Sequence, residues 1–202
     1  MRHHTSAIRS SLLRRCVGWT GVVTLVAGLA VWGLPSGPAA SSAAGAPTCT
    51  TANLDVWLNT AGSGAAGSSY YSLNFTNLSA HTCTMRGYPG VSGITQAGIQ
   101  LGSAASRNPE HAPALITLTS AKTANGFNDN TSRSTATVIL QITVAENFPV
   151  SSCGPVTAAG LRVYPPGQKE STVVPFPFVA CANSASVYLH TEAVQKYVSS
   201  PN

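Results

Sequence analysis

Apolar and polar side chains alternate along much of the chain after about residue 50, which is the spacing of half-buried β-strands. Two clear examples are Leu54–Asn59 and Tyr70–Thr76. The longest alternating stretch is Ser134–Ala145. Its inward-facing side chains are expected to be Val138, Leu140, Ile142 and Val144. No helical period extends beyond two turns, so the pattern predicts an all-β fold.

Further short apolar stretches are bounded by Gly and Pro and predict additional strands. They are Cys83–Met85, Ile94 with Ile99–Leu101 as a hairpin, Leu115–Leu118, Leu161–Tyr164, Thr172–Val179 and Ser186–Val194. Two prolines predict that Thr172–Val179 lies at a sheet edge. Thr60–Ser69 and Lys122–Arg133 are expected to be loops. Eight or nine short strands predict an antiparallel β-sandwich, immunoglobulin-like or jelly-roll-like, whose strand order is left open.

The first forty residues differ from the rest of the chain. Residues 1–15 hold four arginines and no acid, residues 17–34 are apolar and uncharged, and small residues follow. This order predicts a signal peptide at 1–40, a small-residue linker at 41–48 and a single domain at 49–198. The destination is then secretion into the medium. The alternative is an uncleaved signal that anchors the protein in the cell membrane, for which an 18-residue apolar run is just long enough.

The cysteine count agrees with export. Cys49, Cys83, Cys153 and Cys181 remain after the predicted signal peptide, and an even number in an exported domain predicts two disulfides. Of the three possible pairings we favour Cys49–Cys83 and Cys153–Cys181, because each closes a local loop of about thirty residues. A zinc site would need close C-x-x-C pairs, which the sequence lacks.

Charge argues against a nucleic-acid partner. The full chain has a formal net charge of +5, but four arginines lie in the predicted signal peptide. Seven scattered cationic and six acidic residues remain, a net charge of +1. Such a surface cannot neutralise several phosphates at once, so we expect no nucleic-acid binding.

A set of motifs resembles one known family. They are Cys49, Phe75–Asn77, Cys83–Val91 (CTMRGYPGV), Cys153–Pro155, Leu161–Gly167 and Cys181. Together they resemble an actinobacterial exported family catalogued as domain of unknown function 4232, over about Thr48–Val194. The resemblance implies a secreted or surface-tethered β-sandwich and carries over no catalytic residues.

Candidate chemistry is sparse. Gly62–Gly67 matches the G-x-G-x-x-G pattern, but a strand follows where a dinucleotide site needs a helix, so no cofactor is expected. His190 and Glu192 are expected on one face of a strand, and Glu110–His111 in a loop, which could form an acid–base pair or part of a metal site. Neither these residues nor His81 supplies a complete ligand set. We therefore expect no metal site and no catalytic residue.

Aromatic residues suggest a different use. Secreted sandwiches often stack sugars on exposed rings, and the candidates are Tyr70, Tyr71, Tyr88, Tyr164, Tyr188 and Phe127. The competing interpretation is that these rings fill core and turn positions. We expect an exported, non-enzymatic binding or structural module for an unknown extracellular or cell-envelope ligand. The alternative is a secreted hydrolase or metal-dependent enzyme whose site assembles from distant residues.

Overall fold

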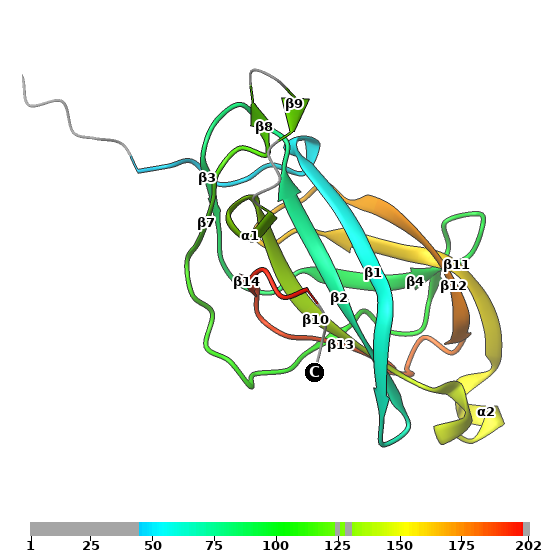
Figure 1. Cartoon of the computed structure of the whole chain (residues 1–202). Helices are drawn as coiled ribbons and strands as arrows, with labels where there is room; N and C mark the ends of the chain where they lie inside the picture. Colours follow the sequence, from blue (N-terminus) through cyan, green and yellow to red (C-terminus); the bar gives the residue numbers. More distant parts are fainter. Residues whose placement is uncertain (1–44, 124–125, 128–130, 200–202) are drawn as a thin grey trace, which may run out of the picture. The chain divides into compact units, whose positions relative to one another are not determined.

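Backbone hydrogen bonds join the strands into two main sheets in the computed structural model (Figure 1). The structure describes residues 45–123, 126–127 and 131–199, and these belong to one compact unit. The predicted signal peptide 1–40 lies outside the described residues, as do residues 41–44 of the predicted linker. The rest of that linker runs into the domain, where Pro47 and Cys49 pair with the backbone of Thr84.

The larger sheet has the strand order β1-β2-β10-β13-β6, with β14 pairing to β10 beside β13. Its strands are β1 (Leu54–Ala65), β2 (Ser68–Asn77), β10 (Thr135–Thr143), β13 (Leu189–Thr191), β6 (Ser106–Arg107) and β14 (Gln195–Lys196). All its pairs are antiparallel except β13 with β6. The outward face of β10 carries the end of the chain, since Val198 N–H bonds Thr137 Oγ1 at 3.0 Å.

The second sheet has the order β12-β11-β4-β5, and its pairs are antiparallel. Its strands are β12 (Thr172–Cys181), β11 (Pro155–Tyr164), β4 (Gly90–Ile94) and β5 (Gln100–Leu101). β12 is at the edge, as its prolines predict. The smaller elements are β3 (Cys83–Met85) with β7 (Ile116–Leu118), β8 (Lys122–Thr123) with β9 (Gly126–Phe127), and the short helices η1 (Thr51–Asn53), α1 (Thr131–Ser134), η2 (Ala145–Asn147) and α2 (Val150–Cys153).

The hydrophobic core lies between the two sheets. Alternate residues of β2 and β10 point inward, and Leu73, Val138 and Leu140 are completely buried there. Leu161 and Val163 of β11 contribute equally buried side chains to the same cluster. The all-β sandwich is therefore confirmed, and the strand order left open by the sequence is now defined. Val138, Leu140 and Ile142 point inward as predicted, whereas Val144 follows the end of β10 and is half-buried. Burying each such side chain stabilises the fold by about 1.5–3 kcal/mol.

The prediction that Thr60–Ser69 is a loop is wrong. β1 and β2 continue through it and meet at a two-residue turn, Ala66–Gly67, whose φ angles are 49° and 77°. Positive φ at both positions is the type I′ turn, which matches the twist of a hairpin. This part of the strand could not be predicted from the sequence, because its small side chains show no alternation of apolar and polar residues. β1, with 12 residues, is consequently longer than β10, which the sequence suggested as the longest strand.

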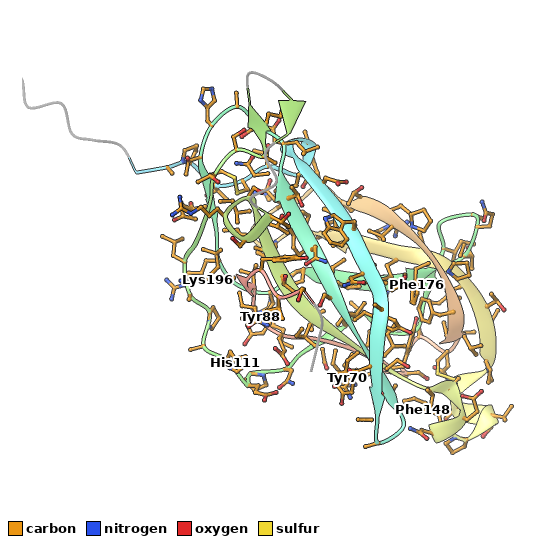
Figure 2. The ribbon with its side chains drawn as sticks, in the orientation of Figure 1. Tyr70, Tyr88, His111, Phe148, Phe176 and Lys196 are labelled. Atoms are coloured by element: carbon orange, nitrogen blue, oxygen red, sulfur yellow. A yellow bond between two sulfur atoms is a disulfide. The ribbon has the colours of Figure 1, made fainter. Side chains whose placement is uncertain are left out.

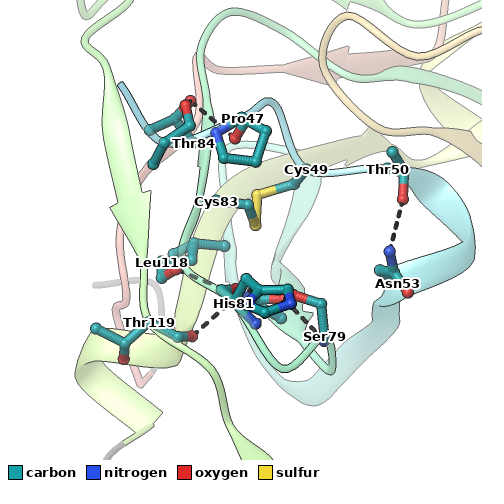
Figure 3. Close-up of a disulfide and its surroundings, with 12 residues drawn as sticks. Pro47, Cys49, Thr50, Asn53, Ser79, His81, Cys83, Thr84, Leu118 and Thr119 are labelled. Carbon is teal, nitrogen blue, oxygen red and sulfur yellow. Dashed lines mark hydrogen bonds between the residues drawn. A yellow bond between two sulfur atoms is a disulfide. The ribbon is translucent and has the colours of Figure 1, made fainter. Parts of the chain in front are cut away.

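Both predicted disulfides are confirmed. Cys49 is bonded to Cys83 and Cys153 to Cys181, with sequence separations of 34 and 28. Figure 3 shows the first of these bonds beside Pro47, where the chain enters the domain. Disulfides of this kind are typical of proteins that fold in an oxidising compartment. Within the described residues, no helix has the length and hydrophobicity needed to cross a membrane.

Candidate functional site

The three histidines expected in the exported domain do not come together. His81 lies in the loop between β2 and β3, where its carbonyl accepts a 2.8 Å hydrogen bond from Asn77 Nδ2 (Figure 3). His111 lies in the loop between β6 and β7, and His190 on β13. Across the described ranges, no group of three His, Cys, Asp or Glu side chains is close enough to hold a metal ion.

His190 forms a cross-strand pair with Ser106. The parallel register of β13 and β6 places them opposite each other, with Ser106 Oγ 2.6 Å from His190 Nδ1. Burial lowers the pKa of His190, which keeps the ring neutral at pH 7. A neutral imidazole can accept the hydroxyl proton, which is the relation of a base to a serine nucleophile. Among the described residues, no side chain forms a hydrogen bond with Nε2, the other ring nitrogen of His190. The described residues therefore supply no third member of a catalytic triad.

The pKa of Glu192, just after β13, is raised above its usual value. Desolvation raises its pKa, Glu110 raises it further by repulsion, and His111 lowers it. His111 Nε2 is 3.9 Å from Glu192 Oε2, and the histidine side chain is 57% exposed. Tyr88 lies beside this pair, since its hydroxyl donates to the carbonyl of His111 at 3.5 Å (Figure 2). The sequence grouped Glu192 with His190 and His111 with Glu110, so the contact of His111 with Glu192 was not expected. It joins an exposed histidine to a carboxylate that is only 14% exposed.

A more apolar site lies where β2, β10 and β12 meet η2. This cavity has a volume of about 220 Å³. Tyr71 of β2 and Ile142 of β10 line it from the first sheet, and Phe176 and Phe178 of β12 line it from the second. Glu146 of η2 completes its lining. An engineered apolar cavity of about 150 Å³ holds benzene, so this space accommodates a substituted ring or a short branched chain.

A row of aromatic rings runs from this cavity into the core. The ring centroids of Tyr71 and Phe176 are 5.0 Å apart at 69°, and those of Phe176 and Phe178 are 5.6 Å apart at 26°. Phe178 is followed by the buried ring of Tyr188 at 6.2 Å. Edge-to-face and offset pairs of this kind stabilise one another by about 0.5–1.5 kcal/mol. The aromatic wall of the cavity therefore packs directly onto the core.

The β1–β2 turn fixes the remaining wall of the cavity. The carbonyl of Gly67 accepts two hydrogen bonds, from Val144 N–H at 3.0 Å and from Asn147 Nδ2 at 2.8 Å. These bonds hold both ends of η2, on which Glu146 is carried. A residue of the hairpin that the sequence predicted as a flexible loop thus positions the only charged group of the cavity lining described here.

Sequence reasoning found only part of this site. It named Tyr71 among the candidate aromatic residues, while Tyr188 fills a core position as the competing interpretation held. It missed Phe176 and Phe178, because Pro175 and Pro177 suggested only a sheet edge. The available signal was the alternation itself, which turns both Phe side chains inward against the prolines. The side chain of Phe127 lies outside the described residues.

A second hollow of about 420 Å³ has a different character. Apolar and polar side chains share its lining, which consists of Leu115, Ile116, Thr117, Leu118, Thr119, Ser132, Arg133, Thr135 and Lys196. Lys196 is labelled in Figure 2. Its hydroxyl groups and two cations hold water by hydrogen bonds beside the apolar side chains, so an apolar ligand gains less by displacing that water than it does in the first cavity. We therefore take the cavity between the sheets as the candidate binding site.

Comparison with known proteins assigns the family. The domain of unknown function DUF4232 matches residues 49–195. The chain belongs to this family. In this DUF4232 domain, the matched segment contains both disulfides and every residue named for the cavity. No curated protein matches the chain, and no solved structure does.

Proposed function

We propose that this protein is an exported, non-enzymatic binding domain of an actinobacterium, which takes the compact apolar part of a small extracellular or cell-envelope molecule into the cavity between its sheets. The observation that carries this proposal is the cavity lined by Tyr71, Phe176 and Phe178. Apolar clefts with few polar groups are the usual form of small-molecule sites. The two disulfides and the predicted signal peptide support the exported location.

The proposal is tested by titrating the protein with tert-butylbenzene and following amide chemical shifts. We expect saturable shifts that centre on Ser69, Val144 and Phe176, which border the cavity. Phe176→Leu keeps an apolar side chain but removes the ring, so affinity should fall by about threefold to tenfold.

The matched control is Val173→Leu on the same strand, which points outward with 55% exposure and lies outside the cavity. This variant should bind the probe like the wild type. Shifts that do not saturate, or that centre on another part of the domain, would contradict the proposal.

A hydrolase is the second candidate, and the hydrogen bond between Ser106 and His190 is the observation that favours it. In that case Ser106 Oγ would bond to an ester carbonyl carbon, and His190 Nδ1 would take the hydroxyl proton and pass it to the departing alcohol. Water would then cleave the acyl group from Ser106 and release the acid. A fluorophosphonate probe would then label Ser106, and Ser106→Ala and His190→Gln would abolish the labelling. The binding proposal predicts no labelling of the wild-type protein.

A further inference from the structure

The cavity combines aromatic walls with a single negative charge. Tyr71, Phe176 and Phe178 provide the rings, and Glu146 is the only residue charged at neutral pH among the described residues that line the cavity. The face of an aromatic ring is electrically negative and attracts cations. The rings and the carboxylate therefore both favour a positively charged ligand.

Glu146 remains available to a ligand. Its side chain is exposed, and the ion pair found among the described residues joins His111 to Glu192 rather than any cation to Glu146. Its backbone is held in place, because Gly67 bonds Val144 and Asn147 on either side of it. The backbone of Glu146 is thus held at the rim of the cavity, and its side chain has no described lysine or arginine as an ion-pair partner.

We infer that the ligand is an organic ammonium ion, either an amine or a quaternary ammonium, whose apolar body fills the cavity and whose positive charge lies against Glu146 and the rings. This inference rests on the proposed function, since it names the chemical class of the molecule bound at the same site. The volume of about 220 Å³ suits a body of one ring with a small substituent. A neutral or anionic ligand of the same shape would leave Glu146 without a partner or repel it.

Two probes of the same shape test the inference. Phenyltrimethylammonium and tert-butylbenzene differ only in the exchange of a cationic nitrogen for a neutral carbon. Wild-type protein should bind the ammonium probe about threefold to tenfold more tightly at low salt. This preference should shrink as salt is added, because Glu146 is exposed and its charge is screened.

Glu146→Gln removes the charge and keeps the size of the side chain, so the preference for the ammonium probe should fall to below about twofold. The matched control is Glu170→Gln, an exposed carboxylate away from the cavity, which should keep the wild-type preference. The amide spectrum of each variant reports whether it is folded.

The outcomes separate this inference from the proposed function. Equal binding of the two probes by the wild type, or an unchanged preference in Glu146→Gln, would overturn the inference and leave the binding function intact. If neither probe binds, both are overturned together. A preference that requires Glu146 supports both.

Discussion

At the scale of single residues, Tyr188 closes the inner end of the aromatic row. Its side chain is completely buried, and its hydroxyl donates a 3.0 Å hydrogen bond to the carbonyl of Leu101. A Cβ added at Gly93 or Gly102 would collide with the hydroxyl or ring of Tyr188. The two glycines therefore leave the space that this tyrosine occupies. Because Tyr188 packs against Phe178, the same contact supports the cavity wall.

Replacing Tyr188 tests this arrangement. Tyr188→Phe leaves the carbonyl of Leu101 without its donor, so the free energy of unfolding at pH 7 should fall by about 1–2 kcal/mol. Urea denaturation of the two proteins measures the difference. An unchanged stability would show that the hydroxyl is dispensable.

The same variant has a predicted pH dependence. Burial raises the pKa of Tyr188 to about 12, against a smaller lowering by a hydrogen bond from the backbone of Gly93. The unfolded chain loses this proton near pH 10, so above that pH the folded state binds more protons and stability falls. The stability advantage of the wild type over Tyr188→Phe should thus be constant below about pH 9 and shrink as the pH rises from 10 towards 12. Urea titrations between pH 7 and 11 would contradict this if the advantage grew.

At the scale of secondary-structure elements, the β1–β2 hairpin links the fold to the candidate site. Its turn needs positive φ at Ala66 and Gly67, and the carbonyl of Gly67 holds η2. Ala is a poor residue for this conformation, whereas Asn and Gly are the preferred pair. The natural turn is therefore not optimised for stability at its first position.

Substitutions at the two positions of the turn should change the stability of the protein in opposite directions. Ala66→Asn should stabilise the protein by about 0.5–1 kcal/mol, and Gly67→Ala should destabilise it by about 1–2 kcal/mol or more. A Cβ at Gly67 also collides with the side chain of Asn147, so Gly67→Ala should weaken ammonium binding as well. Gly64→Ala is the control, because its nearest contact would be 3.9 Å away. Thermal unfolding measures the stability of the three variants, and probe titration measures their affinity. A Gly67→Ala variant as stable as the wild type would contradict the prediction.

The strands show why the fold could be predicted from the sequence more completely than the candidate site. Periodicity predicted β2 and β10 because large apolar side chains alternate there with polar residues. It failed at Thr60–Ala65, where the side chains are small and the pairing of β1 with β2 shifts register between Asn59 and Ser63. It also could not join Ser106 to His190, since parallel pairing of two strands more than eighty residues apart leaves no local pattern.

At the scale of the whole molecule, the disulfides hold different parts of the sandwich. Cys49–Cys83 joins the entry of the chain to β3, while Cys153–Cys181 joins α2 to the end of β12. The second bond follows closely after Val179, which borders the cavity. The pairing could be predicted because local loops are favoured, but the relation of one bond to the cavity depends on the tertiary fold.

Removing each disulfide separately should distinguish these roles. Replacing either cysteine pair with alanine should lower the free energy of unfolding by about 2–4 kcal/mol. Loss of Cys153–Cys181 should also weaken binding of the ammonium probe, whereas loss of Cys49–Cys83 should leave its affinity nearly unchanged. Urea denaturation and probe titration on the two double variants test this, and equal losses of affinity would contradict it.

The direction of the β1–β2 hairpin also bears on how the protein is best attached to a surface. The chain enters next to β1, which begins at Leu54 (Figure 1). About six residues further along the hairpin, β2 contributes Tyr71 to the cavity. At a rise of about 3.3 Å per residue, this separation is about 20 Å. Coupling to a sensor chip through the first described residue, Gly45, should therefore leave the mouth of the cavity in solution. Coupling at the other terminus would place the attachment next to Ser199. The carbonyl of Ser199 accepts a 2.6 Å hydrogen bond from Asn59 Nδ2 on β1.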